Sequence, residues 1–251
     1  GEHAVLRLLS DRALDYNLKT LGFSPANRKI ISQALQKPYG MILDTGPTGS
    51  GKTTTLYAML KKLNTAQASV VTIEDPIEYS LPGINQIGVN SRTGLNFANG
   101  LRSILRQDPN IIMVGEIRDS ETARLAVNTA LTGHLLLSTL HTNDATTTLP
   151  RLIDMGVEPY LIASTVNIAI GQRLVRKICR HCQIQKSLSG SQRQSLQNLL
   201  SAPPPDRDLP VYQGQGCAAC GNSGFAGRIG LHEILVLDAG LRESVLQKAS
   251  A

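Results

Sequence analysis

The chain has 251 residues, and its 41% apolar and 18% charged residues are sufficient for a large core and exclude wholesale disorder. Its net charge of +6 permits nucleotides, nucleic acids or acidic membranes as partners and selects none of them. The sequence contains no run of about 18 apolar residues, which argues against a membrane-spanning helix. The first residues, Gly1–Ala4, have neither a signal-peptide pattern nor a Met, so we expect a piece of a longer protein.

Short apolar stretches alternate with amphipathic stretches over roughly the first 170 residues. Ser24 followed by Pro25 is typical of a helix start, because serine caps the helix and proline suits its first position. Strands are predicted at 41–43, 70–73, 84–89, 111–114 and 135–137, and helices at 25–35, 56–63, 97–105 and 120–131, before Gly156 and after Pro159. This alternation predicts an α/β fold with a mostly parallel sheet and helices on both faces.

A phosphate-binding pattern follows the first predicted strand and precedes a predicted helix. The pattern G-x-x-x-x-G-K-[ST] is complete, formed by Gly46, Pro47, Thr48, Gly49, Ser50, Gly51, Lys52 and Thr53. The glycines let backbone N–H groups converge on a phosphate, and the start of the helix adds the positive end of its dipole. Lys52 is predicted to reach the β- and γ-phosphates of ATP, and the Thr53 hydroxyl to bind Mg²⁺.

Two buried strands are followed by acidic residues at the edge of the sheet where ligands bind in α/β folds. Glu74 directly follows the strand predicted at 70–73, and Glu116 follows the strand predicted at 111–114 after Gly115. A P-loop enzyme needs an acid near Mg²⁺ and a group that orients the attacking water. Either acid could instead be a helix cap or a solvated loop charge, and for Asp119 we prefer the helix cap.

His141 stands at the end of the third apolar strand, on the same predicted edge as the phosphate loop. An imidazole in this position can donate a hydrogen bond to a γ-phosphate. His134, at the other end of the strand, is expected to be structural. Arg102 and Arg106 are four residues apart and share a helix face. This pair is explained either by a nearby anion or by an ordinary solvated surface.

The second half of the chain contains two cysteine pairs. They follow a change near residue 171 from alternating apolar and amphipathic stretches to a more polar sequence. Cys179, Cys182, Cys217 and Cys220 form two C-x-x-C pairs separated by a polar stretch, residues 183–216. Four thiolates suit a closed, tetrahedral Zn²⁺ site with no open position for catalysis. A redox-active pair and coincidence are the alternatives.

Four blocks in this order resemble those of one protein family. They are the phosphate loop, the segment 72–78, the segment 105–119 and the segment 132–143. They look like the Walker A motif, Asp box, Walker B motif and His box of the motor ATPases of type II secretion and type IV pilus assembly (the GspE/PilB-type secretion ATPase superfamily). Asn110 stands where Asp is commoner in that family, and the cysteine pairs resemble its export and pilus-assembly branch.

The resemblance implies a RecA-like P-loop NTPase and a role for each matching residue. Glu116 would polarise the attacking water, Glu74 would support the Mg²⁺ and water shell, and His141 would sense the γ-phosphate. Arg102 and Arg106 match arginines that approach phosphate in the family. Arg7 matches the tail of the PAS-like domain that precedes the ATPase core, and the resemblance implies that it contributes to nucleotide binding. The implied domains are the tail of a PAS-like domain (1–20), the ATPase core (21–171), the tetracysteine module (172–230) and the start of a helical region (231–251).

For the whole protein, the resemblance implies a hexameric motor that hydrolyses ATP with Mg²⁺ on the cytoplasmic face of the inner membrane. Its expected partners are other copies of itself, inner-membrane platform and adaptor proteins, and acidic phospholipid. No nucleic acid is expected, and the scarcity of aromatic side chains agrees with this. The alternatives are a RecA-like motor that moves nucleic acid and a scaffold that binds ATP without turnover.

Overall fold

The computed structural model describes residues 16–199 and 210–247, which fold into two compact units. Among these residues, the first unit contains 16–174 and 230–247, and the second contains 175–199 and 210–229. Arg7 lies outside the described residues. Both units share the long strands β6 (Val166–Ile178) and β9 (Phe225–Val236), whose residue ranges cross the division between them.

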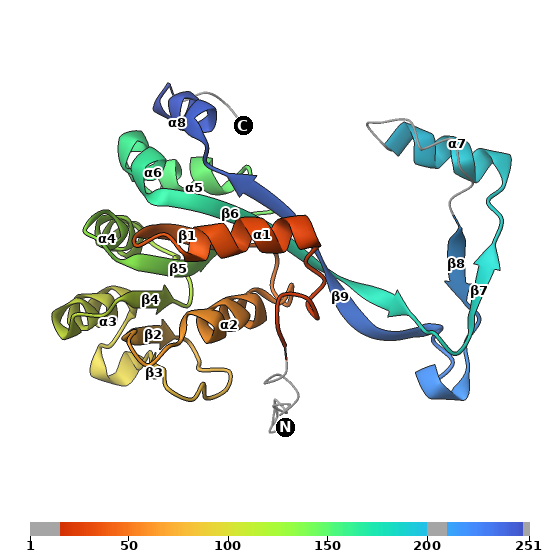
Figure 1. Cartoon of the computed structure of the whole chain (residues 1–251), viewed down its shortest axis with the longest axis horizontal. Helices are drawn as coiled ribbons and strands as arrows, with labels where there is room; N and C mark the ends of the chain where they lie inside the picture. The colour runs from red at the N-terminus through yellow and green to blue at the C-terminus, as the bar shows by residue number, and fades with distance from the viewer. Residues whose placement is uncertain (1–15, 200–209, 248–251) are drawn as a thin grey trace, which may run out of the picture. The chain divides into compact units, whose positions relative to one another are not determined.

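A seven-stranded sheet forms the centre of the first unit (Figure 1), in the order β3-β2-β4-β5-β1-β6-β9. Its register sets Thr45 of β1 beside Leu140 of β5 and Gly171 of β6. All pairings from β3 to β6 are parallel. The remaining strands are β1 (Gly40–Thr45), β2 (Val70–Glu74), β3 (Asn85–Gly88), β4 (Ile111–Val114) and β5 (Leu135–Leu140). Parallel strands bring the loops after β1, β2, β4 and β5 to one edge.

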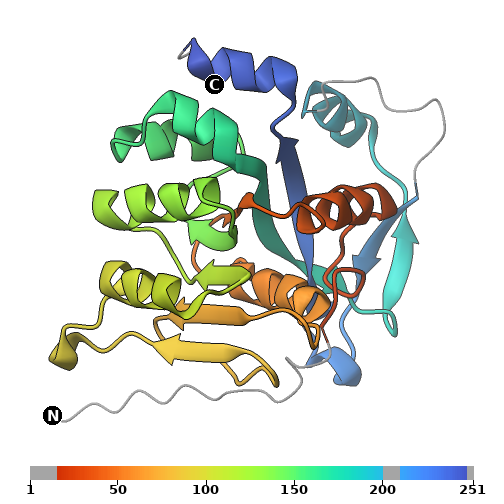
Figure 2. The same ribbon diagram turned by 60° about the vertical axis from the view of Figure 1, so that its left-hand side comes forward.

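Helices cover both faces of this sheet, as the two views show (Figures 1 and 2). On one face, α1 (Pro25–Leu35) and α2 (Lys52–Leu63) pack on a core that includes Ile42 and Met113. The core of the other face includes buried residues of α3 (Phe97–Ile104), α4 (Ser120–Leu131), α5 (Thr148–Asp154), α6 (Pro159–Thr165) and α8 (Ala239–Leu246). Strands buried on both faces need continuous apolar runs, which explains the run Ile111–Val114. The α/β fold with a mostly parallel sheet is therefore confirmed.

Caps fix the ends of several helices where the sequence indicates them. The Ser24 side chain accepts from the Asn27 N–H at the start of α1, with Pro25 at the first position. Asp119 caps α4 by accepting a hydrogen bond from the Thr122 N–H at 2.8 Å. This is the role that the sequence indicates for Asp119. His134 lies 3.2 Å from the Thr129 carbonyl oxygen, a contact within the helix–strand turn.

The chain after residue 171 differs from the sequence-based expectation at two places. Residues 172–174 continue strand β6 in the first unit, and residues 231–236, where a helical region was expected to start, complete strand β9. Among the described residues after 230, only α8 is helical. The Leu237 N–H donates to the Asn167 carbonyl oxygen at 3.1 Å, so the end of β9 lies beside the beginning of β6. This pairing satisfies backbone groups that the edge of the sheet would otherwise expose.

The second unit is small and has its own two-stranded sheet. Strands β7 (Gln183–Lys186) and β8 (Val211–Gly214) pair antiparallel, and α7 (Gly190–Leu199) follows β7. Arg176 lies over the ring of Phe225, with 4.0 Å from its guanidinium carbon to the ring centre. None of the helices in the described part of the chain is long and apolar enough to cross a membrane.

Candidate nucleotide site

The phosphate-binding loop joins β1 to α2 at the centre of the sheet. Gly46, Gly49 and Gly51 all have positive φ angles, of 145°, 77° and 92°, which glycine adopts without steric cost. Gly51 is the residue before the first turn of α2, so the loop leads directly to the positive end of the helix dipole. The local sequence therefore produces the backbone that a phosphate requires.

Lys52 lies folded against its own loop. Its ammonium group donates to the carbonyl oxygens of Gly46 at 2.8 Å and Pro47 at 3.2 Å. Burial lowers the pKa of Lys52, while the negative charges of Asp44 and Glu116 act in the opposite direction. These two carboxylates therefore place negative charge near the lysine from the strand before the loop and from the segment after β4.

Asp44 is a fully buried acidic residue near the end of β1, two positions before the phosphate loop. Neither of its carboxylate oxygens has a hydrogen-bond partner among the described residues. Burial raises the pKa of Asp44 well above its ordinary value, although the positive charge of Lys52 opposes the shift. A buried carboxyl without a partner favours its neutral form, so we expect Asp44 to hold a proton more tightly than a solvated aspartate.

Glu116 and His141, which follow the neighbouring strands β4 and β5, lie in contact with each other. Its Oε2 atom lies 3.0 Å from Nε2 of His141 and 2.6 Å from Nε of Arg118. Glu116 is 8% exposed, whereas the side chains of His141 and Arg118 are about half and 60% exposed. The hydrogen bond to Glu116 raises the pKa of Arg118. The structure thus brings together two of the predicted residues and adds an arginine.

The His141 segment is tied to the start of the phosphate loop. The N–H of Thr142 donates to Oγ1 of Thr45 at 2.9 Å. Thr45 is the last residue of β1 and immediately precedes Gly46. The hydroxyls of Thr45 and Thr142 also contact each other. Movement of either segment is therefore expected to affect the other.

Glu74 lies in a separate, buried hydrogen-bond network. It is 2% exposed, and its carboxylate accepts from the hydroxyls of Tyr57 and Thr72 and from Nε2 of Gln86. Burial and the bond to Glu74 raise the pKa of Tyr57. Both carboxylate oxygens of Glu74 are therefore already occupied by groups of the core.

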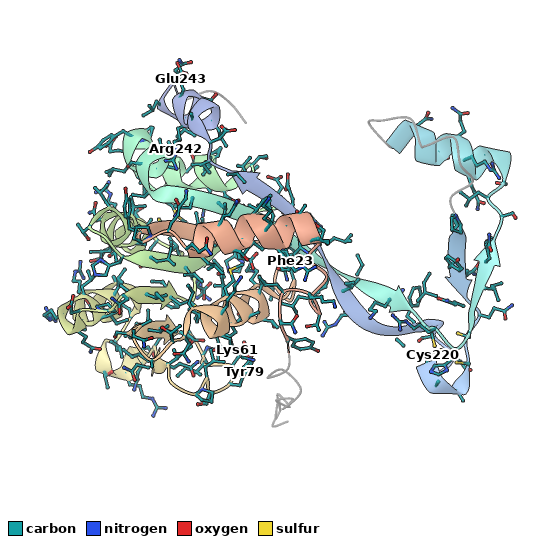
Figure 3. All side chains as sticks on the ribbon, in the orientation of Figure 1. Phe23, Lys61, Tyr79, Cys220, Arg242 and Glu243 are labelled. Carbon is teal, nitrogen blue, oxygen red and sulfur yellow. The ribbon has the colours of Figure 1, made fainter. Side chains whose placement is uncertain are left out.

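Two further contacts surround this network. The ring of Tyr79 packs edge-on against Tyr57 at 4.7 Å between ring centres. Lys61 lies 5.9 Å from the centre of the Tyr79 ring, and the two are labelled in Figure 3. Tyr57 also accepts from Nε2 of Gln86 at 3.2 Å. The network joins α2 to β2 and β3, so it supports the helix that follows the phosphate loop.

Arg102 and Arg106 lie on the surface of α3 and its 3₁₀ extension. Arg102 forms an ion pair with Glu121 of α4 at 2.5 Å and donates to Oδ1 of Asn99 at 3.1 Å. Arg106 lies 3.5 Å from the hydroxyl of Ser103. Within the described chain, the structure does not bring either arginine to the phosphate loop.

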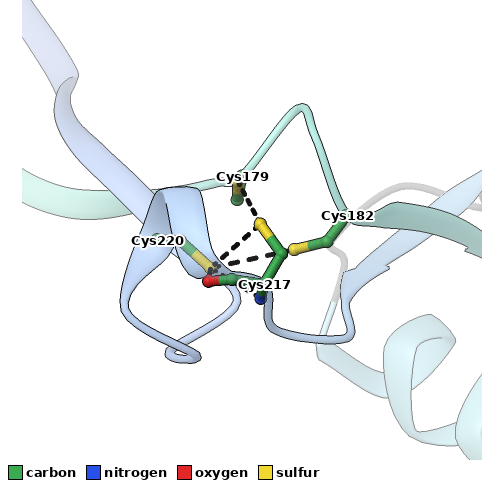
Figure 4. Close-up of side chains that lie close together, drawn as sticks. All are labelled: Cys179, Cys182, Cys217 and Cys220. Carbon is green, nitrogen blue, oxygen red and sulfur yellow. Dashed lines mark hydrogen bonds between the residues drawn. The ribbon is translucent and has the colours of Figure 1, made fainter.

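The four cysteines of the second unit converge on one point (Figure 4). All four sulfur atoms lie within 4.8 Å of one another. Three of the separations are 3.9 Å (Cys179 to Cys217), 3.9 Å (Cys182 to Cys220) and 3.7 Å (Cys217 to Cys220). A tetrahedral site with Zn–S bonds of about 2.3 Å has sulfur–sulfur edges of about 3.8 Å. The separations therefore fit a metal held by four thiolates.

Several site residues were not predicted from the sequence. Asp44 is a charged residue in the otherwise apolar run after Gly40, and this anomaly could have marked it. Arg118 stands two positions after Glu116, but its pairing depends on the turn after β4. Gln172 and Thr45 carry no local signal, because their partners are distant in sequence.

Comparison with known proteins identifies the family. The family model described as type II/IV secretion system protein matches residues 1–251. The chain belongs to the type II/IV secretion system protein family. It is 48% identical over 245 residues to the type II secretion system protein E of Aeromonas hydrophila, covering 98% of the chain and 48% of that protein.

A second relative and two solved structures agree with this membership. The chain is 46% identical over 251 residues to the type IV pilus assembly ATPase PilB of Thermus thermophilus, covering 100% of the chain and 28% of PilB. It resembles the pilus retraction motor PilT with bound ADP, with a TM-score of 0.70 and 30% identity over 96% of the chain and 58% of that structure. It resembles the ATPase DotB of Legionella pneumophila with a TM-score of 0.63 and 28% identity, over 92% and 53%. The chain thus spans about half of the secretion protein and of the two solved structures, and about a quarter of PilB.

Proposed function

We propose that this chain is the ATP-hydrolysing part of a motor that powers type II protein secretion or type IV pilus assembly. The observation that carries the proposal is the convergence of Glu116 and His141 at the sheet edge that also holds the phosphate loop and Lys52. A relative named as a secretion protein and another named as a pilus assembly ATPase, each matched over nearly the whole chain, support the motor role.

The phosphate loop and Lys52 would bind the phosphates of ATP. The loop N–H groups and the start of α2 supply fixed positive potential, and Lys52 would exchange its two carbonyl contacts for phosphate oxygens. The hydroxyl of Thr53 at the beginning of α2 would hold Mg²⁺. When bound, Mg²⁺ neutralises charge that develops on the β- and γ-phosphates.

Glu116 would act on the attacking water, because its carboxylate is at the phosphate edge and is held by neighbours. His141 and Arg118 both contact its Oε2 atom. Oε1 has no hydrogen-bond partner among the described residues, so it would accept a proton or a hydrogen bond from water. His141 is half-exposed, so its imidazole can turn toward a γ-phosphate. Glu74, enclosed by Tyr57 and Thr72, would support α2 from below the loop.

Arg102 and Arg106 would act only in an assembled ring of six copies. Both are exposed, Arg102 on α3 and Arg106 on its 3₁₀ extension, where a neighbouring copy could place its own phosphates near them. An arginine supplied by another subunit stabilises transition-state charge in many P-loop enzymes. Arg7, in the tail of the preceding domain, would contribute to nucleotide binding. The expected partners of the ring are platform and adaptor proteins at the cytoplasmic face of the inner membrane, together with acidic phospholipid.

The tetracysteine cluster would hold one structural Zn²⁺. Four sulfur ligands close the coordination sphere, so the ion would stabilise the second unit and would not bind substrate. The unit has few buried apolar residues in its described part, and metal binding would supply free energy that a small core does not.

The test is phosphate release from Mg²⁺–ATP by the chain, with its oligomeric mass measured in the same preparation. We expect hydrolysis that rises with assembly and with vesicles containing acidic phospholipid. Lys52→Ala should lose nucleotide binding and serves as the negative control. Stimulation by DNA and not by vesicles would favour a nucleic-acid motor. ATP binding without turnover by an assembled ring would favour a scaffold.

A further inference from the structure

Gln172 is a buried polar residue directly beneath the phosphate loop. It is 3% exposed and belongs to β6, the strand that pairs with β1 on the side away from β5. The residue before it, Gly171, pairs in register with Thr45 at the end of β1. The side chain therefore lies where the chain leaves the sheet to form the loop.

Both ends of the Gln172 amide are bonded to the nucleotide-binding segment. Its Nε2 donates to the carbonyl oxygen of Ser50 at 2.7 Å, and its Oε1 accepts from the hydroxyl of Thr55 at 2.7 Å. Both hydrogen bonds are buried. Ser50 belongs to the loop and Thr55 to the first turns of α2. One side chain thus fixes the loop and the helix relative to each other.

Two loop glycines lie against the same residue. A Cβ atom on Gly46 would be 2.3 Å from the carbonyl oxygen of Gln172, and one on Gly51 would be 2.8 Å from its Nε2. Any side chain at these positions would displace the loop from β6. The glycines of the motif therefore also permit close contact between the loop and Gln172.

The bond to Ser50 has a direct consequence for phosphate binding. The C=O and N–H of a trans peptide point in opposite directions. When Gln172 holds the Ser50 carbonyl toward β6, the N–H of Gly51 is directed away from Gln172, where it can donate to an anion. Without this donor, the Ser50–Gly51 peptide is free to rotate, and the N–H is no longer fixed before the nucleotide arrives.

We propose that Gln172 is a positioning residue that preorganises the phosphate-binding loop, by holding the Ser50 carbonyl and the Thr55 hydroxyl from strand β6. The inference rests on the proposed nucleotide function of the loop. It assigns to a residue 122 positions from Ser50 a part in phosphate binding without contact to the nucleotide.

The decisive variant is Gln172→Glu, which keeps the shape and the acceptor for Thr55 but removes the donor to Ser50. At pH 8 we expect its affinity for Mg²⁺–ADP, measured by calorimetry, to fall about tenfold or more, because two buried oxygens then face each other. Protonation of the new carboxyl restores an O–H donor. The affinity relative to the parent should therefore recover as the pH is lowered toward about 5.5.

Gln33→Glu is the matched control, since Gln33 is exposed on α1 and the change adds the same charge to the same unit. This variant should bind as the parent does at each pH. Gln172→Met, which removes both polar functions without adding charge, should bind about fivefold more weakly or worse at every pH. It replaces the first variant if Gln172→Glu does not fold by circular dichroism.

Three outcomes separate the possibilities. Weak binding that recovers at low pH only in Gln172→Glu supports the positioning role. Binding within twofold of the parent at pH 8 by a folded Gln172 variant overturns it, while the proposed function stands. Failure of the parent chain to bind Mg²⁺–ADP refutes the proposed nucleotide function, and the positioning role with it.

Discussion

The imidazole Nε2 of His141 lies 3.0 Å from Oε2 of Glu116, although the two residues are 25 positions apart in the chain. Arg118 contacts the same oxygen at 2.6 Å. One carboxylate oxygen is thus contacted by an imidazole and a guanidinium, while the other has no hydrogen-bond partner in the part of the chain that the structure describes. This arrangement orients the carboxylate before any ligand binds.

Glu116→Gln should therefore keep Mg²⁺–ATP binding and lose most turnover. The amide has the same shape but cannot accept a proton, and general-base catalysis contributes roughly 10²–10⁴-fold. Nucleotide affinity and phosphate release are measured on preparations of equal oligomeric mass. Glu158→Gln, at an exposed position before α6, is the control. A rate within threefold of the parent would show that Glu116 is not the group that activates the water.

Removing charge at Arg102 or Arg106 should reduce hydrolysis more than it reduces nucleotide affinity. These arginines are expected to meet the transition state of a neighbouring copy, where charge exceeds that of the bound nucleotide. Arg102→Gln and Arg106→Gln are compared with the parent in an assembled ring by steady-state kinetics. Since Arg102 pairs with Glu121, Glu121→Gln tests whether loss of that ion pair alone matters. Unchanged rates would mean that both arginines are ordinary solvated surface charges.

Cys179→Ser should loosen the second unit while the first unit still binds nucleotide. Cys179 is a fully buried member of the sulfur cluster, whereas the first unit has its own two-layered core. Metal analysis of protein purified without chelator should give about one Zn²⁺ per parent chain. Limited proteolysis of the variant should cut within residues 175–229. Equal cleavage of both units would mean that they fold as one.

Asp44 should make the protein less stable as the pH rises above about 4. Its pKa in the folded protein is raised by burial, so the folded state holds the proton more tightly than the unfolded chain. The resulting stability is complete below the ordinary carboxyl pKa and is lost as the pH rises toward the folded pKa.

Asp44→Val tests this directly by chemical denaturation between pH 4 and pH 8. The variant should be more stable than the parent at pH 8, by about 1–3 kcal/mol, because an unpaired buried polar group is removed. It should also show a smaller fall of stability with pH. Asp154→Asn, on α5, serves as the charge-removal control. Equal pH dependence of Asp44→Val and the parent would contradict the assignment.

Features encoded by neighbouring residues could be predicted from the sequence. Eight consecutive residues, 46–53, specify the phosphate loop, because glycine conformations and a helix start are local properties. Asp119 and Ser24 cap helices through residues three positions away, and apolar runs mark the central strands. The clustering of the cysteines was predictable from their paired spacing.

Only the tertiary structure decided which distant groups meet. Strand β9 was missed because it lies at the edge of the sheet, where an alternating, half-exposed sequence gives a weak signal. The sequence offers Glu74 and Glu116 as equivalent acids after strands, but Glu74 is enclosed by Tyr57 and Glu116 faces His141. Gln172 becomes meaningful only when the sheet order sets β6 beside β1. Such contacts depend on strand pairing over more than 100 residues, which no local pattern encodes.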